Sequence, residues 1–85
     1  MDISKDEQRV LHALAKGGRI EAAKTSSGRI TGLDVFTREG WTMPGVSVRI
    51  FRKLKRKRAV ASRQGGPYRI TRRGLELVRS QPDNR

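Results

Sequence analysis

The chain has 85 residues, with 20 Lys and Arg against 8 Asp and Glu, a formal net charge of +12 and no cysteine. This length fits one domain, residues 1–85, with a small core, and the lack of cysteine excludes disulfides, thiolate zinc sites and cysteine nucleophiles. No apolar run approaches the roughly 20 residues of a membrane span, and no signal-peptide core is present. We therefore expect a cytoplasmic protein that binds nucleic acid or an acidic protein surface, not a membrane.

The first helix is predicted to cover residues 4–16. Ser4 and Glu7 have the spacing of a capping box, in which each side chain accepts a hydrogen bond from the backbone amide of the other residue. The apolar stripe that follows consists of Val10, Leu11 and Leu14. Gly17 suits the left-handed conformation that ends a helix.

A hairpin is predicted next, with strands at about residues 19–24 and 29–37. Ile20 and Ala22 alternate with polar neighbours, and residues 25–28 have the composition of a turn. Gly32 interrupts the second strand and could mark a β-bulge.

The segment between this hairpin and the next helix contains the only tryptophan. Residues 38–40 are typical of a turn, after which Trp41 and Met43 could add a short strand. We expect Trp41 to be a core anchor and only secondarily a platform for stacking. Pro44 and Gly45 then break the chain.

Residues 46–58 are the most strongly charged segment and are predicted to form a helix. Its apolar face consists of Val46, Ile50, Phe51 and Leu54. The cations stand opposite that face, on its flanks and at the carboxyl end: Arg49, Arg52, Lys53, Lys55, Arg56, Lys57 and Arg58. No acidic residue occurs between Glu39 and Glu76, although a solvated helix normally mixes both signs. We therefore expect an anionic partner, the alternative being a merely solvated basic face.

A second hairpin is predicted from residues 59–63 and 68–70, joined by a glycine-rich turn. Thr71 can cap a last helix, about 72–80, with Leu75 and Val78 facing inward. Arg72 and Arg73 lie at the positive amino end of that helix, where cations are unfavourable, so we expect their charges to serve the binding of a partner. Residues 81–85 are expected to fray.

The predicted order is helix, hairpin, helix, hairpin, helix, which is an α+β domain. Its second half resembles the corresponding half of a winged-helix domain, with the basic helix as recognition helix and residues 63–69 as the wing. The chain departs from a winged-helix domain before the basic helix, where a hairpin replaces the usual second helix. The candidate nucleic-acid-binding or partner-binding residues are Arg49, Arg52, Lys53, Lys55, Arg56, Lys57, Arg63 and Arg69.

The residue types do not predict an enzyme. The 8 carboxylates are scattered and form no recognisable acid–base pair. His12, the only histidine, lies opposite the apolar stripe of its helix, so we expect an exposed surface residue and not a general base or metal ligand. No nucleotide-binding loop, cofactor motif or metal-ligand cluster is present, and we expect none of these groups to bind.

Motifs spread over the whole chain resemble those of one known family. They are Glu7-Gln8-Arg9, Leu11-His12, the segment 14–20, Arg38-Glu39-Gly40, Phe51, Lys53-Leu54-Lys55, Lys57, Pro67-Tyr68-Arg69-Ile70 and Asn84-Arg85. On these motifs the chain resembles the YjhX family of small bacterial proteins, although residues 41–45 depart from its pattern. The resemblance implies a toxin of a toxin–antitoxin pair that inhibits DNA topoisomerase I, and therefore two partners, the topoisomerase and a cognate antitoxin.

Charge pattern and resemblance together predict an inhibitor that uses its basic helix to bind topoisomerase I, its DNA, or both. The alternative is a DNA-binding transcriptional regulator of the winged-helix type. Both would use the same helix, so charge alone does not separate them. A regulator should form a dimer that reads two half-sites, whereas an inhibitor should bind a protein even without DNA.

Overall fold

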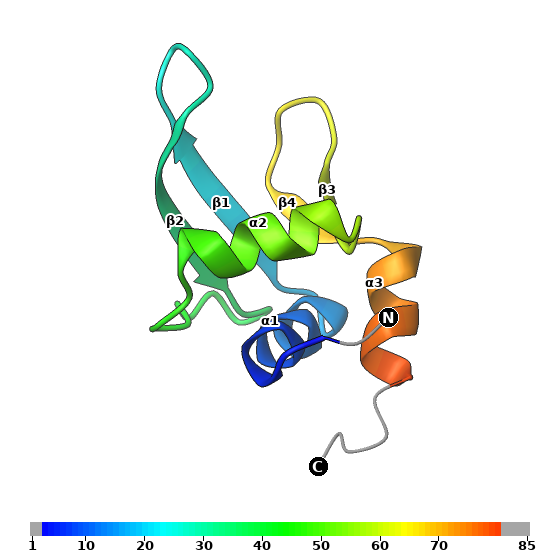
Figure 1. The fold of residues 1–85 in the computed structure, drawn as a ribbon. Coiled ribbons are helices and arrows are strands. Elements are labelled where there is room, and N and C mark those ends of the chain that lie inside the picture. The colour runs from blue at the N-terminus through cyan, green and yellow to red at the C-terminus, as the bar shows by residue number, and fades with distance from the viewer. Residues whose placement is uncertain (1–2, 81–85) are drawn as a thin grey trace.

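The computed structural model describes residues 3–80 and contains three helices and a four-stranded antiparallel sheet (Figure 1). The elements are α1 (Lys5–Ala15), β1 (Arg19–Lys24), β2 (Ile30–Phe36), α2 (Val48–Arg56), β3 (Val60–Ser62), β4 (Tyr68–Ile70) and α3 (Arg72–Arg79). The predicted α+β class is confirmed. The predicted fraying of residues 81–85 lies outside the described residues. Within those residues, no helix is long and apolar enough to cross a bilayer.

The strands lie in the order β2-β1-β4-β3, so the two hairpins join through β1 and β4. Ile20 on β1 lies opposite both Val35 and Tyr68, and all three side chains are buried. Between β1 and β2 the register shifts after Ala23, because Gly32 pairs with Ala23 whereas Ile30 pairs with Lys24. The extra residue of the bulge is therefore Thr31, the neighbour of the predicted Gly32.

The core lies between the sheet and the helices. Phe51 and Leu54 of α2 are both 0% exposed, which confirms the predicted orientation of this helix. The Phe51 ring meets the Tyr68 ring edge to face, with centroids 4.8 Å apart. The other fully or nearly fully buried apolar side chains include Val10, Leu11, Leu14, Ile20, Val35, Ala59, Val60, Leu77 and Val78.

Local signals set the helix ends as predicted. The Glu7 amide donates to Ser4 Oγ at 3.2 Å, and the Ser4 amide donates to Glu7 Oε1 at 3.0 Å. Gly17 follows α1 with φ of 113°, a conformation that strains residues with a Cβ. Thr71 caps α3 through a hydrogen bond from the Gly74 amide, at 3.0 Å.

Two predicted core residues are placed differently. Trp41 is 73% exposed and not a core anchor, because hydrogen bonds to Thr37 hold it in the turn after β2, and Met43 packs against the core instead. On α3, Leu77 is buried together with Val78, whereas Leu75 is only half-buried. Gly74 lies so close to the Ala59 carbonyl that a Cβ at this position would collide with it. This contact determines which side of α3 faces the core.

His12 was predicted to be exposed, and the structure corrects this. The residue is half-buried, since α1 contacts α2, α3 and β4 and so is covered on several sides. Its Nε2 atom is buried without a hydrogen-bond partner among the described residues. Within these residues, no group of three or more His, Cys, Asp or Glu side chains is arranged to hold a metal ion.

Candidate nucleic-acid interface

The helix α2 is stopped sharply at both ends. Ser47 caps its start, where the Ile50 amide donates to Ser47 Oγ at 3.3 Å. At its end Arg58 has φ of 58°, and the Ala59 amide donates to the Leu54 carbonyl at 2.9 Å, as in a Schellman motif. The Thr71 hydroxyl also donates to the Arg58 carbonyl at 2.6 Å, which ties the end of α2 to the start of α3.

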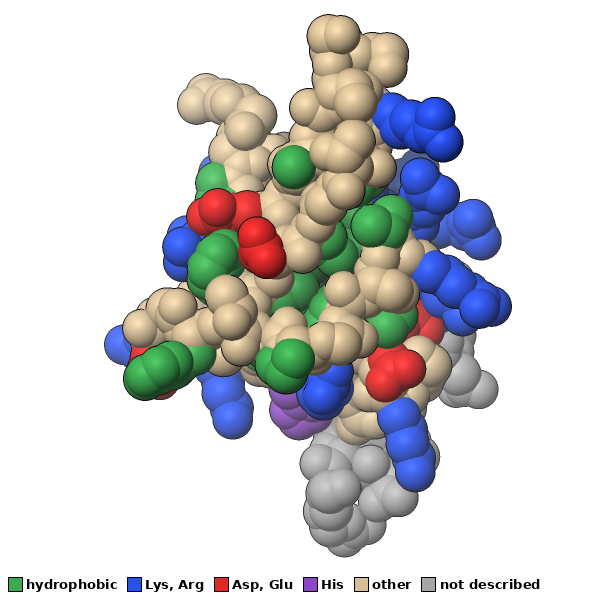
Figure 2. All heavy atoms as spheres, turned by 90° about the vertical axis from the view of Figure 1, so that its left-hand side faces the viewer, with side chains coloured by type: hydrophobic (Ala, Val, Ile, Leu, Met, Phe, Trp, Pro, Cys, Tyr) green, Lys and Arg blue, Asp and Glu red, His purple; other side chains and the backbone are tan. Residues whose placement is uncertain are grey.

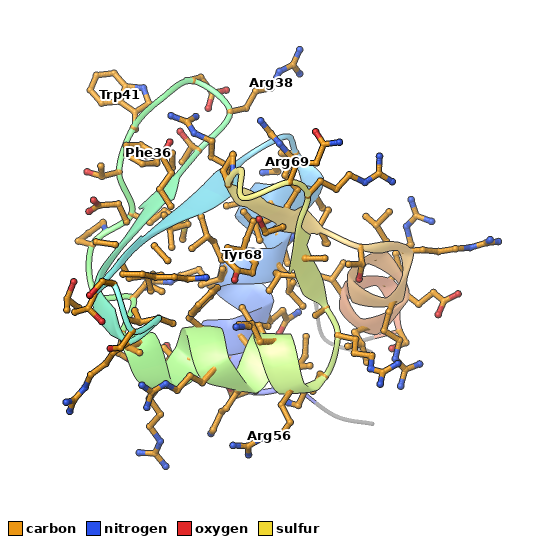
Figure 3. The ribbon with its side chains drawn as sticks, turned by 90° about the horizontal axis from the view of Figure 1, so that it is seen from above. Phe36, Arg38, Trp41, Arg56, Tyr68 and Arg69 are labelled. Atoms are coloured by element: carbon orange, nitrogen blue, oxygen red, sulfur yellow. The ribbon has the colours of Figure 1, made fainter. Side chains whose placement is uncertain are left out.

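The surface of α2 that faces away from the core carries the basic cluster Arg49, Arg52 and Arg56. All three side chains are exposed, α2 contains no acidic residue, and none of the three forms an ion pair within residues 3–80. Figure 2 shows Lys and Arg side chains gathered along one edge of the molecule, and Figure 3 shows Arg56 pointing away from the sheet. Of the flanking lysines, Lys55 is exposed and Lys53 is half-buried.

Lys57 differs from the other predicted site residues because it points toward α1. Its Nζ lies 2.8 Å from Glu7 Oε2 and 3.0 Å from Glu7 Oε1, and Glu7 is 2% exposed. Burial alone would raise the pKa of the Glu7 carboxyl, but the hydrogen bonds from Lys57 and Ser4 lower it below its ordinary value. Lys57 thus joins the end of α2 to the start of α1.

Lys55 is held near two aromatic rings. Its Nζ lies 5.6 Å from the Phe51 ring centre and 5.5 Å from that of Tyr68, within the range of cation–π attraction. Lys24 Nζ donates to the Tyr68 hydroxyl at 3.2 Å. Burial would raise the pKa of Tyr68, but the Lys24 hydrogen bond and the charges of both lysines lower it. Lys55 therefore extends the basic cluster while also packing on the aromatic pair.

The two predicted wing residues, Arg63 and Arg69, lie apart from the basic cluster. Successive side chains of a strand point to opposite faces, so Arg69 points away from α2 because its neighbour Tyr68 packs beneath α2 (Figure 3). Arg63 and Arg69 line a hollow of about 600 Å³ together with Arg72. The sequence singled out Arg72 because a cation is unfavourable at the positive start of a helix. No sequence pattern predicted that Arg63, Arg69 and Arg72 would line the same hollow.

Comparison with protein families assigns the whole chain to one family. The whole chain, residues 1–85, matches a family model described as "Putative toxin of bacterial toxin-antitoxin pair". The chain belongs to the YjhX toxin family. Membership in this family implies a cognate antitoxin as a partner of the chain.

Relatives of this chain occur in several bacteria. A UPF0386 protein of Chelativorans sp. is 61% identical over 85 residues, covering 100% of both chains. A UPF0386 protein of Hyphomonas neptunium is 57% identical over 84 residues, or 99% of each chain, and one of Mesorhizobium japonicum is 64% identical over 92% of this chain and 79% of its own length. No solved structure matches the chain.

Proposed function

We propose that this protein acts as a toxin that inhibits DNA topoisomerase I by binding duplex DNA beside the enzyme through the exposed face of α2. The observation that carries the proposal is the basic cluster Arg49, Arg52 and Arg56, which stands on one helix face without a carboxylate. Like charges so close together repel one another. A phosphate backbone would relieve that repulsion and release counterions, which favours binding.

The dimensions of α2 suit this role. Its 9 residues extend about 14 Å, and a helix of about 10–12 Å diameter fits the major groove of B-DNA, about 12 Å wide. Arg49, Arg52 and Arg56 are spaced by three and four residues, so they follow one side of the helix. They can contact phosphates along one groove edge while Phe51 and Leu54 stay in the core.

The charge of the chain decides between possible routes of inhibition. A protein of net charge +12 does not mimic DNA, so it does not compete for the basic groove in which a topoisomerase holds its substrate. Two routes remain, namely docking on an acidic surface of the enzyme and binding the DNA next to it. We favour DNA because its charge density is high and continuous, with one charge per ~1.7 Å.

We also propose that the protein acts by binding and not by catalysis. A general acid or base needs a proton-transfer group that is free to meet a substrate. Glu7 is the buried carboxylate among the described residues, and its two oxygens accept hydrogen bonds from Lys57 and Ser4. The Glu7 carboxylate therefore stabilises the fold and is not available to transfer a proton to a substrate.

A winged-helix regulator remains the second candidate, and one observation favours it. β4 pairs with both β1 and β3, which places the glycine-tipped β3–β4 hairpin beside β1, the strand that follows the first helix. As expected from the sequence, the chain differs from a winged-helix domain before α2, because β1 is followed by β2 and not by a second helix. This candidate requires preference for one DNA sequence, which arginines contacting only phosphates do not provide.

Relaxation of supercoiled plasmid by purified DNA topoisomerase I tests the proposal. The unmodified protein should inhibit relaxation, and Arg52→Glu/Arg56→Glu should abolish the inhibition while the circular dichroism spectrum is unchanged. A matched control, Arg29→Glu/Arg79→Glu, makes the same change of charge at two exposed arginines outside α2 and should keep most of the inhibition.

The outcomes separate the candidates. Full inhibition by the folded Arg52→Glu/Arg56→Glu variant would exclude the exposed face of α2 as the working surface. No inhibition by the unmodified protein, combined with strong preference for one duplex in a sequence-selection experiment, would replace the toxin proposal by the regulator. For duplex binding, the slope of log affinity against log salt should be about −0.9 for each phosphate contact.

A further inference from the structure

The face of the sheet opposite α2 carries arginines and aromatic rings in neighbouring positions. On this outer face Phe36 of β2 pairs with Arg19 of β1, and Arg69 of β4 pairs with Ala61 of β3. The Arg19 guanidinium lies 4.4 Å from the centre of the Phe36 ring. In Figure 3, Trp41, Arg38 and Arg69 lie on the side of the sheet away from α2, whereas Arg56 points the other way.

Trp41 is presented by a closely hydrogen-bonded turn. The Thr37 amide donates to the Trp41 carbonyl at 2.7 Å, and the Trp41 amide donates to Thr37 Oγ1 at 3.1 Å. The Gly40 amide donates to the Thr37 carbonyl at 3.0 Å. Trp41 is nevertheless 73% exposed and is the large hydrophobic side chain left in solvent among residues 3–80. An ordered turn that displays an indole without burying it provides a stacking surface.

The hollow at the other side of this face is suited to an anion. Its charged lining residues are Arg63, Arg69 and Arg72, and no carboxylate lines it. On the same face of the sheet Glu21 of β1 pairs with Asp34 of β2, and Glu21 also forms an ion pair with Arg19, whose Nε lies 2.8 Å from Glu21 Oε2. Arg63, Arg69 and Arg72 themselves form no ion pair within residues 3–80.

Gly17 connects the turn to the hollow. Arg69 Nη1 donates to the Gly17 carbonyl at 3.4 Å. A Cβ placed on Gly17 would lie 3.3 Å from Cγ and Cδ of Arg38, so the stem of Arg38 covers the same residue from the side of the turn. Arg69 of the hollow and Arg38 of the turn therefore both contact Gly17, on the opposite side of the sheet from the basic cluster of α2, and Trp41 is held by the same turn as Arg38.

We infer that this outer face is a second nucleic-acid site, which binds single-stranded DNA or RNA independently of α2. Phosphates would occupy the hollow of Arg63, Arg69 and Arg72, and a base would stack on Trp41. Single-strand sites combine a cationic groove with aromatic side chains in this way. An unpaired strand fits better than a duplex, because the bases of a duplex are already stacked on one another and do not offer a free face to Trp41.

Trp41 is the only tryptophan, so its fluorescence reports directly on this face. Titration with a single-stranded oligothymidylate should quench the emission, and titration with a duplex of equal length should quench it much less. By anisotropy of a labelled oligothymidylate, Trp41→Ala should weaken binding about fivefold or more, the lower limit for the loss of one stacked base. The same oligonucleotide should bind Arg52→Ala/Arg56→Ala with little change, which separates this site from α2.

The helix α3 offers a matched pair of arginines for testing the hollow. Arg72→Ala should weaken single-strand binding and reduce the salt slope by about 0.7, whereas Arg79→Ala, at the other end of the helix, should do neither. Equal losses from both variants, or full affinity in Trp41→Ala, would overturn the inference. Quenching of Trp41 by polyglutamate as strong as by the oligonucleotide would also overturn it and assign the face to an acidic protein.

Discussion

Replacing Lys57 by alanine tests the contact that fixes α2 to α1. The variant leaves the Glu7 carboxylate, which is 2% exposed, without its cationic partner. Removing one member of a buried ion pair costs about 3–5 kcal/mol. We expect about 3 kcal/mol, the lower end, because the Ser4 amide still donates to Glu7 and the Lys57 side chain is itself 20% exposed. For a domain of this size the melting temperature should fall by roughly 12–24 °C.

Urea unfolding followed by circular dichroism at several pH values measures this effect. The pKa of Glu7 is lowered in the folded state, so its stabilisation is complete above the ordinary value of 4.5 and is lost as the pH falls through the folded-state pKa. The difference between the two proteins should therefore be largest near neutral pH and shrink in acid. Arg56→Ala, an exposed neighbour on α2, should change the unfolding free energy by less than about 0.5 kcal/mol. A loss below about 1 kcal/mol in Lys57→Ala at neutral pH would refute the reasoning.

Three further substitutions test the fold. Phe51→Ala removes a side chain that is 0% exposed and should cost about 3–5 kcal/mol, so that its thermal melt is lost or shifted far down; an unchanged melting temperature would contradict the packing of α2. Arg58→Gly should raise the unfolding free energy in urea by about 0.5–1 kcal/mol, since Arg58 has φ of 58°; destabilisation would argue against this helix end. Trp41→Ala should change stability by less than about 0.5 kcal/mol in the same assay, because the side chain is 73% exposed.

Features that depend on neighbouring residues were predictable from the sequence. The Ser4–Glu7 capping box and the Thr71 cap were predicted because each joins residues three positions apart. The inward orientation of Phe51 and Leu54 followed from helical periodicity. The same periodicity predicted the outward direction of Arg49, Arg52 and Arg56, so this part of the candidate site needed no tertiary information.

Features that depend on distant residues were not predictable in the same way. Lys57 and Glu7 are 50 positions apart, and no local pattern distinguishes Lys57 from the other cations of its segment. The hollow brings Arg72 beside Arg63 and Arg69 only because the turn after β3 folds back next to the start of α3. Trp41 was wrongly predicted to be buried because large hydrophobic residues are buried on average. Here the hydrogen bonds of the turn hold its side chain in solvent.

Different kinds of contact hold the two ends of α2, polar ones at its carboxyl end and apolar packing at its amino end. At the carboxyl end Lys57 is paired with Glu7, and the Arg58 carbonyl accepts a hydrogen bond from the Thr71 hydroxyl, whereas Ile50 near the amino end is half-buried and packs against the core. Because the polar contacts are directional, we expect a partner that displaces α2 to tilt the helix about the hydrogen bond between Arg58 and Thr71. Thr71 and Arg72, which follows it directly, both line the hollow, so a tilt of α2 would be felt there first.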